Sequence, residues 1–286
     1  MSFNRLYFDK NQVAHSFSRF AESYNEHAFV QKEIGQRLLE RCLWLRDSPK
    51  RILDLGSGTG MMIPFLKKAF PKAEIVELDR AFGMLLQSKN DRSLWDKLRA
   101  TKSLIQGDLE SIPFQANTFD LIYSNCTLQW ANDLNHAFKE VARVLTPKGS
   151  FFFTTLGPGT LHEIKGCFQE IDEFPHVHDF VDLQSYGDLL FKSGLDSPVV
   201  DQAPLTVTYQ NLNACLRDLR NTGARNLNPD RSKGLTPPSK AKKLQQLFQK
   251  QLDQKGHFPC TYEVIYGHAH KKETNITKCI PLILKS

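Results

Sequence analysis

The sequence lacks the long apolar run that a membrane-spanning helix needs. No hydrophobic stretch among its 286 residues approaches the roughly 20 residues that cross a bilayer. The N-terminal Met-Ser-Phe-Asn-Arg-Leu-Tyr-Phe-Asp-Lys also lacks the continuous apolar centre of a signal peptide. We therefore expect a cytoplasmic protein with no membrane partner, long enough to bury a sizeable core.

Closely spaced cysteines are also absent. The six cysteines are scattered and form no C-x-x-C pair, which is typical of reduced thiols in a cytosolic chain. His176 and His178 form an H-x-H in a loop-like stretch, but no cysteine or acidic cluster with metal-ligand spacing lies near them. We predict no metal site.

Acidic and aromatic residues are both scarce between positions 217 and 250. Nine lysines and arginines stand there against only Asp218 and Asp230, in a chain whose net charge is +6. Such a segment is either a solvated helix face or a patch that attracts an anionic partner. RNA-modifying enzymes generally add stacking aromatics to basic residues, and Phe248 is the one aromatic here. We therefore expect no nucleic-acid partner, and an RNA methyltransferase is a weak alternative.

What the sequence does contain is a glycine-rich turn after a short apolar strand, Arg51-Ile-Leu-Asp-Leu-Gly-Ser-Gly-Thr-Gly60. The glycines let a ligand approach the backbone beside the N–H groups of the following helix. A dinucleotide fingerprint would need its third glycine at position 61, which is Met61. The D-x-G-x-G-x-G spacing instead resembles motif I of the class I S-adenosylmethionine (SAM) methyltransferases.

Strands and helices alternate from 51 to 156, which is typical of a parallel sheet with helices on both faces. Expected strands at 74–79, 103–108, 119–125 and 149–156 follow the first one. Segments 198–209 and 261–270 read as an antiparallel pair that closes the sheet. We predict an α/β fold with a doubly wound, mostly parallel seven-stranded sheet.

Polar side chains end four of these strands, namely Asp54, Asp79, Asp108 and Asn125. In such sheets ligands bind at the carboxyl ends of the strands, so the four should meet in one crevice. A lone aspartate there is usually a cap or turn former. Three of them after one glycine turn favour SAM, with Asp79 (rather than Glu77) on the ribose and Asp108 on the adenine amine. The predicted cofactor-binding set is Asp54, Gly56, Ser57, Gly58, Gly60, Asp79, Arg80, Asp108, Leu109 and Asn125.

The remaining segments divide into a lid, an insertion and a tail. Apolar residues at helical spacing predict two helices over 11–46 within an N-terminal lid, 1–48. The SAM-binding core spans 49–210 and 259–272. The helical, basic segment 211–258 is too long for a hairpin loop and is predicted to be an insertion that selects the substrate partner. Residues 273–286 form a tail.

Several blocks together narrow the resemblance to the malonyl-acyl-carrier-protein O-methyltransferases of biotin synthesis. The similarity runs from about Val13 to about His270, and its most discriminating parts are the first, third and last blocks. They are Val13–Tyr24, Gly107–Phe114, Ser124–Trp130, Phe153–Leu156 with Gly159–Leu161, and Asp218–Ala224. Departures are Ser57, where cysteine is frequent, and Arg80-Ala81, where a small polar residue and proline are frequent.

The resemblance implies methyl transfer from SAM to the free carboxylate of a malonyl thioester, carried by acyl carrier protein or coenzyme A. S-adenosylhomocysteine would be the second product, and the methyl ester would prime pimeloyl and biotin synthesis. A carboxylate with a pKa of about 4 is already ionised at neutral pH, so no general base is expected. Catalysis should come from holding the carboxylate oxygen in line with the methyl group and the sulfur of SAM.

The positioning residues implied are Arg19, Tyr24, Asn125, Gln129 and Trp130, and the partner-binding residues are Arg217, Arg220 and Arg225. Arg19 could equally be a solvated helix residue, and Trp130 could be plain core. Two alternatives stay open. One is a class I methyltransferase acting on another small carboxylate or hydroxyl, and the other is a SAM-fold factor that assembles or hydroxylates a partner protein.

Overall fold

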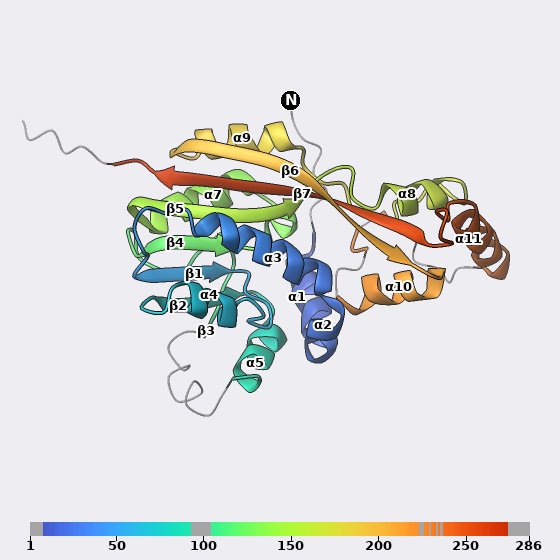
Figure 1. Ribbon diagram of the computed structural model, residues 1–286, viewed down its shortest axis with the longest axis horizontal. Helices are drawn as coiled ribbons and strands as arrows, with labels where there is room; N and C mark the ends of the chain where they lie inside the picture. The colour runs from blue at the N-terminus through green and yellow to red at the C-terminus, as the bar shows by residue number, and fades with distance from the viewer. Residues whose placement is uncertain are drawn as a thin grey trace, which may run out of the picture.

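The computed structural model describes residues 8–92, 104–222, 226–228, 230–232, 234 and 237–273. At its centre lies a seven-stranded sheet in the order β3-β2-β1-β4-β5-β7-β6 (Figure 1). Strands β1 to β5 run parallel, and β7 lies antiparallel between β5 and β6. The predicted fold is confirmed. The strands are β1 (Arg51–Leu55), β2 (Glu74–Asp79), β3 (Leu104–Gln106), β4 (Phe119–Ser124), β5 (Leu145–Leu156), β6 (Leu195–Tyr209) and β7 (Phe258–Lys271).

Helices cover both faces of the sheet because successive side chains of a strand point to opposite sides. On one face, Ile52 of β1 packs in a cluster with α3 (Phe29–Cys42) and α4 (Ile63–Ala69). On the other, Leu53 packs in a cluster with α7 (Leu134–Val144) and α9 (Leu183–Lys192). Helix α5 (Phe82–Asn90) follows β2. The strand order reverses between β1 and β4, which is where a ligand crevice is expected in this architecture.

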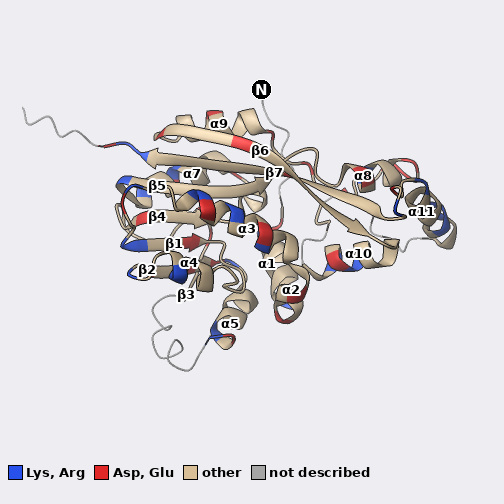
Figure 2. Ribbon diagram, viewed as in Figure 1, with Lys and Arg blue, Asp and Glu red and all other residues tan. Residues whose placement is uncertain are grey.

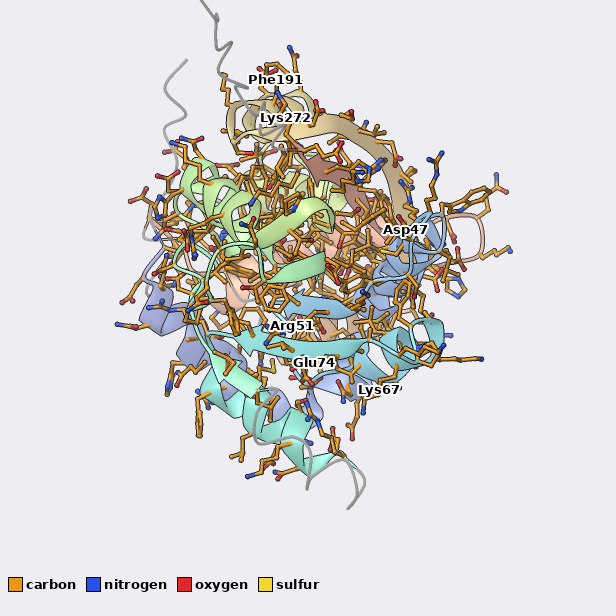
Figure 3. The ribbon with its side chains drawn as sticks, turned by 90° about the vertical axis from the view of Figure 1, so that its left-hand side faces the viewer. Asp47, Arg51, Lys67, Glu74, Phe191 and Lys272 are labelled. Atoms are coloured by element: carbon orange, nitrogen blue, oxygen red, sulfur yellow. The ribbon has the colours of Figure 1, made fainter. Side chains whose placement is uncertain are left out.

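The amino ends of the parallel strands, at the edge of the sheet opposite the expected crevice, carry none of the predicted site residues that the structure describes. Figure 3 looks onto the amino ends of the parallel strands, where Arg51 and Glu74 begin neighbouring strands. Their side chains form an exposed ion pair, with Arg51 Nε 3.3 Å from Glu74 Oε2. Among the helices in the described ranges, none is long and apolar enough to cross a membrane.

The N-terminal segment forms three helices where two were predicted over 11–46. They are α1 (Lys10–Arg19), α2 (Ala21–His27) and α3. Phe20 (φ −104°, ψ 9°) and Ala28 (φ −87°, ψ 35°) leave the helical conformation, so the chain bends twice. Apolar spacing alone could not show these bends, because the aromatic residues keep the same 3.6-residue period across the first of them.

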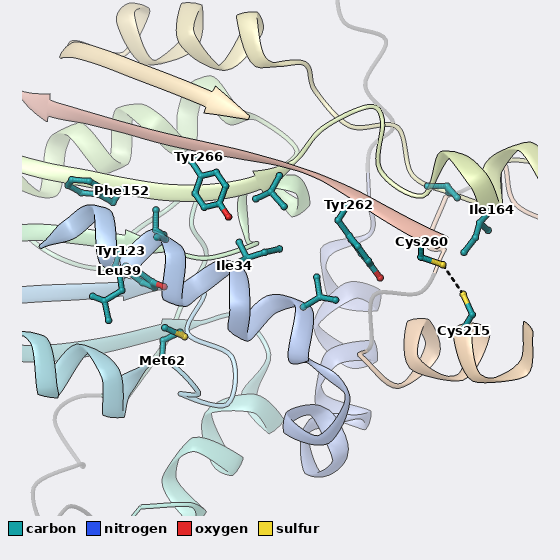
Figure 4. Packing of buried hydrophobic residues seen from close by; sticks show 14 of the residues in the cluster. Ile34, Leu39, Met62, Tyr123, Phe152, Ile164, Cys215, Cys260, Tyr262 and Tyr266 are labelled. Atoms are coloured by element: carbon teal, nitrogen blue, oxygen red, sulfur yellow. Dashed lines mark hydrogen bonds between the residues drawn. The ribbon is translucent and has the colours of Figure 1, made fainter. Parts of the chain in front are cut away.

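Strands β6 and β7 extend well past the end of β5 as a two-stranded ribbon (Figure 1). At its far end gather α8 (His162–Gln169), α10 (Leu212–Asn221) and α11 (Pro238–Lys250). The ring of Phe248 stacks on that of Phe258 with centroids 3.9 Å apart. The buried thiols of Cys215 on α10 and Cys260 on β7 lie 3.3 Å apart between the helix and the strand (Figure 4). Helices α10 and α11 are thus packed on the ribbon.

A histidine ties the N-terminal helices to the insertion. The Nδ1 atom of His27, the last residue of α2, lies 3.0 Å from Asp218 Oδ1 on α10. Its Nε2 atom lies 2.9 Å from Asn221 Nδ2. We call this contact the His27 latch. Two residues of the Asp218–Ala224 block therefore have a structural role, and Gly223 to Arg225 lie outside the described residues.

Candidate active site

The three turn glycines all have left-handed backbone angles, yet their surroundings differ. A Cβ on Gly56 (φ +78°) would lie 2.2 Å from Thr127 Oγ1, and one on Gly60 (φ +70°) would lie 2.4 Å from Ser88 Oγ. A Cβ on Gly58 (φ +57°) would meet nothing within 4 Å. Gly56 and Gly60 therefore allow close packing of the protein against itself, whereas Gly58 borders open space.

Three buried oxygen atoms, which have no hydrogen-bond partner among the residues that the structure describes, belong to residues that line the hollow next to Gly58. They are Asp54 Oδ2, Ser57 Oγ and Gln31 Oε1. Burial raises the pKa of Asp54 well above its usual value, and the nearby carboxylates of Glu77 and Asp79 raise it further. Such a site suits a ligand that brings positive charge and N–H donors. We call it the Asp54 hollow, and it is lined by Tyr24, Gln31, Asp54, Gly56, Ser57, Gly58, Thr59, Met61, Met62 and Asn125.

A larger crevice runs along the carboxyl ends of β1, β2 and β3. Asp79 Oδ2 accepts the Gly58 N–H at 2.9 Å, and its Oδ1 accepts the Ala81 N–H at 2.7 Å. Asp79 therefore braces the glycine turn as well as facing the crevice. Burial raises the pKa of Asp79 although these N–H groups oppose the rise. The strand-end crevice is lined by Lys10, Val13, Ala14, Phe17, Tyr24, Gly56, Gly58, Leu78, Asp79, Arg80, Ala81, Met84, Gly107, Asp108, Leu109, Asn125, Cys126, Thr127 and Trp130.

Asp108 lies in the same crevice and is held by two cations. Its Oδ2 lies 2.7 Å from Lys10 Nζ and 2.6 Å from Arg80 Nη1. Burial acts to raise the pKa of Asp108, but hydrogen bonds from Lys10 and the Glu110 N–H, with the charges of Lys10 and Arg80, keep it below its usual value. Asp108 thus stays ionised and ties α1 to the end of β3.

Lys10 is a charged crevice residue that sequence reasoning missed. It meets Asp108 across 98 positions of the chain, and no local pattern marks so distant a pair. Glu77 was the other candidate for binding the ribose hydroxyls. It lines neither the Asp54 hollow, nor the crevice, nor the inner cavity described next. Its carboxylate is buried and binds Ser88 Oγ at 2.5 Å and the Arg92 guanidinium.

The third hollow is a larger inner cavity beneath the N-terminal helices. Among the described residues that line it there is no aspartate or glutamate, whereas Arg220, His176 and His178 are present. Its electrostatic character is therefore opposite to that of the Asp54 hollow. The inner cavity is lined by Phe17, Tyr24, Val30, Gln31, Ile34, Cys126, Gln129, Trp130, Leu156, Thr160, Leu161, Ile164, Phe168, His176, Val177, His178, Phe180, Leu216, Leu219, Arg220, Thr222, Asn226, Ser232, Gly234 and Tyr262.

Tyr24 lies where the Asp54 hollow, the crevice and the inner cavity meet, since it lines all three. Trp130 lines the crevice and the cavity, and its ring contacts Phe8, Phe17 and His178 at centroid distances of 5.6, 5.4 and 5.4 Å. Gln129 Nε2 donates to the Cys126 carbonyl at 2.7 Å. This hydrogen bond closes the turn that leads to Trp130.

The structure brings together most of the predicted site residues. Tyr24, Asn125, Gln129 and Trp130 border these hollows, as do Arg80, Leu109 and Arg220. Arg19 is not brought there. It is exposed at the end of α1, with its guanidinium 5.9 Å from the Phe20 ring centroid.

Helix geometry explains the position of Arg19. Val13 and Phe17 point inward, and a residue two positions after Phe17 faces the opposite side of the helix. Arg217 is exposed and lines none of the three hollows. Gly60 borders none of them either. Arg225 lies outside the described residues.

Comparisons with known proteins agree with this geometry. Residues 53–153 match a family model described as a methyltransferase domain. The chain is 38% identical over 285 residues to the malonyl-[acyl-carrier protein] O-methyltransferase of Gallionella capsiferriformans, covering 99% of this chain and 98% of that one. It is 37% identical over 277 residues to the Legionella pneumophila protein of the same name, covering 95% and 96%.

Solved structures share the fold at lower identity. The YcgJ protein from Bacillus subtilis superposes with a TM-score of 0.55 at 20% identity, covering 82% of this chain and 97% of that one. A methyltransferase from Bacillus halodurans, described as putative, gives a TM-score of 0.55 at 15% identity, covering 83% and 98%. With relatives this similar over nearly its whole length, the chain belongs to the malonyl-[acyl-carrier protein] O-methyltransferase family and is a SAM-dependent O-methyltransferase.

Proposed function

We propose that this protein methylates the free carboxylate of a malonyl thioester carried by acyl carrier protein, giving the ester that primes pimeloyl and biotin synthesis. The observation that carries the proposal is the pair of oppositely charged hollows that meet at Tyr24. The Asp54 hollow offers a cation buried oxygens that have no partner among the described residues. The inner cavity offers an anion cationic and neutral groups. The names of the relatives support the same acceptor.

The residues of the Asp54 hollow and of the crevice fit SAM. Asp54, Ser57 and Gln31 would hold its ammonium group, because their buried oxygens have no other partner among the described residues. Asp79 would bind the ribose hydroxyls and Leu109 would contact the adenine ring, with Asp108 beside it. When bound, SAM supplies an electrophilic methyl group on a positively charged sulfur.

The inner cavity fits an acceptor that is already ionised. Burial raises the pKa of the Tyr24 phenol, and the nearby Cys126 and Asp79 add to the rise, so its hydroxyl keeps its proton and can donate to a carboxylate. Burial also raises the pKa of Cys126 to about 12, which leaves a neutral thiol rather than a nucleophile. The site thus orients two substrates without acid–base chemistry.

A hydroxyl acceptor is less well served. Removing its proton would require a base, and no carboxylate lies among the described residues of the inner cavity. Nε2 of His178 accepts the Leu227 N–H, and Nε2 of His176 lies 2.8 Å from Asp172. One ring nitrogen of each imidazole is therefore engaged with the protein itself.

A methyl-transfer assay tests the proposal directly. Purified protein with methyl-labelled SAM should label malonyl-carrier protein as a base-labile methyl ester. The matched acetyl thioester, which lacks the free carboxylate, should stay unlabelled. An absence of label on every malonyl thioester, or equal labelling of the acetyl control, would overturn the proposal.

The substitution Tyr24→Phe should lower kcat for malonyl methylation by about tenfold and change the Kd for SAM by less than about threefold. It removes one hydrogen bond to an anion, worth about 1.5 kcal/mol or more, and keeps the ring between the hollows. Single-turnover kinetics and calorimetry would separate the two quantities. A Kd that rises as much as kcat falls would show that the hydroxyl serves SAM binding instead.

A further inference from the structure

Helix α11 carries the most one-sided charge of the insertion. Its thirteen residues, Pro238–Lys250, include four lysines and no acid, as Figure 2 shows at the far end of the ribbon. Leu244, Leu247 and Phe248 are buried on its inner face. Helix α10 differs, because Asp218 stands between its arginines. The lysines of α11 are Lys240, Lys242, Lys243 and Lys250.

Two of these lysines contact residues just after α8, and the other two are exposed to solvent. Lys240 Nζ lies 2.8 Å from Asp172 Oδ2, and Lys243 Nζ donates to the Glu170 carbonyl at the end of α8. Lys242 and Lys250 are exposed, and no ion pair joins either to a carboxylate in the part of the chain that the structure describes.

A groove between α8 and α11 adjoins the inner cavity. The two hollows share Phe168, His176, Asn226, Ser232 and Gly234 as lining residues. The rings of Phe168 and His176 stack with centroids 3.8 Å apart at this boundary. The α11 groove is lined by Phe168, Ile171, Asp172, His176, Asn226, Arg231, Ser232, Gly234, Pro237, Lys240 and Leu244.

The groove has a net positive lining and adjoins the inner cavity, which Tyr24 also lines. Arg231 and Lys240 line it, and its single described acid, Asp172, is already paired with Lys240 and His176. A phosphate bound there would find positive charge, and a chain extending inward would enter the acid-free inner cavity. A phosphopantetheine arm has this pattern, with a phosphate at the protein end and a thioester at the other.

We propose that the lysine face of α11 docks an acidic carrier protein and that the α11 groove admits its phosphopantetheine arm to the inner cavity. This rests on the proposed function and places the partner on a different helix from the one expected. Arg220 lines the inner cavity, Asp218 is used by the His27 latch, and Arg225 lies outside the described residues. Arg217 alone remains, among the described residues of α10, as an exposed cation outside the three hollows.

The double variant Lys242→Glu/Lys250→Glu tests the docking surface. With malonyl-carrier protein, its KM should rise by about tenfold or more at low salt, because surface charges act mainly on encounter and are screened by ions. With malonyl-coenzyme A, which has the same arm but no protein, KM should stay within about twofold. Lys242 and Lys250 line neither the groove nor the inner cavity, so the chemistry itself is untouched.

A matched control reverses two exposed lysines at the other end of the molecule. Lys68→Glu/Lys72→Glu, on and just after α4, makes the same change in net charge and should leave both KM values unchanged. Thermal melting should show all variants folded. Arg217→Glu is a second comparison on α10.

The outcomes separate the two proposals. If the unmodified protein methylates neither thioester, the proposed function fails. If it methylates both, but Lys242→Glu/Lys250→Glu leaves the carrier KM unchanged or raises both KM values equally, docking on α11 is refuted. If Arg217→Glu raises KM for malonyl-carrier protein and Lys242→Glu/Lys250→Glu does not, the carrier docks on α10, which overturns the proposal as well.

Discussion

Replacing Asp54 with asparagine should weaken SAM binding by about 100-fold or more while leaving the fold intact. The substitution keeps the shape of the side chain but removes the charge that a bound ammonium needs, and breaking one partner of a buried pair costs about 3–5 kcal/mol. Asp54 Oδ2 has no other partner in the described part of the protein, so nothing else would replace that contact. Calorimetric titration with SAM would measure the change.

The same variant should be more stable than the unmodified protein when SAM is absent. Folding raises the pKa of Asp54 above its ordinary value of about 4. The folded chain then binds more protons than the unfolded one, so stability falls as pH rises from about 4 through the raised pKa. Asparagine removes this loss, and the apoprotein of Asp54→Asn should melt at a higher temperature at neutral pH.

SAM affinity should also depend on pH in the unmodified protein. It should increase as pH rises through the raised pKa of Asp54, because the carboxylate must ionise to hold a cation. In Asp54→Asn this dependence should disappear. Glu74→Gln, at the exposed amino end of β2, serves as the control and should change neither property. An unchanged Kd in Asp54→Asn would remove Asp54 from the binding site.

Gly56→Ala should destabilise the protein by about 2–4 kcal/mol, whereas Gly58→Ala should cost about 1 kcal/mol. Both positions have left-handed backbone angles, which cost alanine about 1 kcal/mol. Only at Gly56 would the new methyl group also collide with Thr127, at 2.2 Å from Oγ1 and 2.3 Å from Cγ2. Overpacking of this kind adds about 1–3 kcal/mol.

Urea unfolding without SAM would compare the two variants. Gly58 borders the Asp54 hollow and the crevice. The Gly58→Ala variant should therefore bind SAM more weakly, despite its milder effect on stability. The pair therefore separates a glycine whose Cβ would collide with Thr127 from one whose Cβ would meet nothing within 4 Å. Equal free energies of unfolding would contradict this assignment.

Much of the fold was predictable because it rests on local patterns. Alternating apolar segments indicated the parallel strands, and parallel strands end at one edge of a sheet. That rule predicted that Asp54, Asp79, Asp108 and Asn125 meet in one crevice. Asp79, Asp108 and Asn125 line the crevice, whereas Asp54 lines the neighbouring Asp54 hollow. The division into lid, core and insertion remains a prediction.

The rest depended on long-range contacts that no local pattern records. Asp108 was predicted to bind the adenine amine, and its ion pairs with Lys10 and Arg80 could not be read from the sequence. Arg19 was a candidate because it lies within a family-like block, yet the turn of α1 points it outward. The groove beside α11 is formed by segments far apart in the chain, which only folding brings together.

The His27 latch has a consequence for turnover. Because one imidazole ring joins α2 to both Asp218 and Asn221, an outward swing of the helix that carries Tyr24 must either break that ring's contacts or drag α10 along. If S-adenosylhomocysteine and the methylated thioester leave through the opening that such a swing would make, both departures would depend on the same ring contacts.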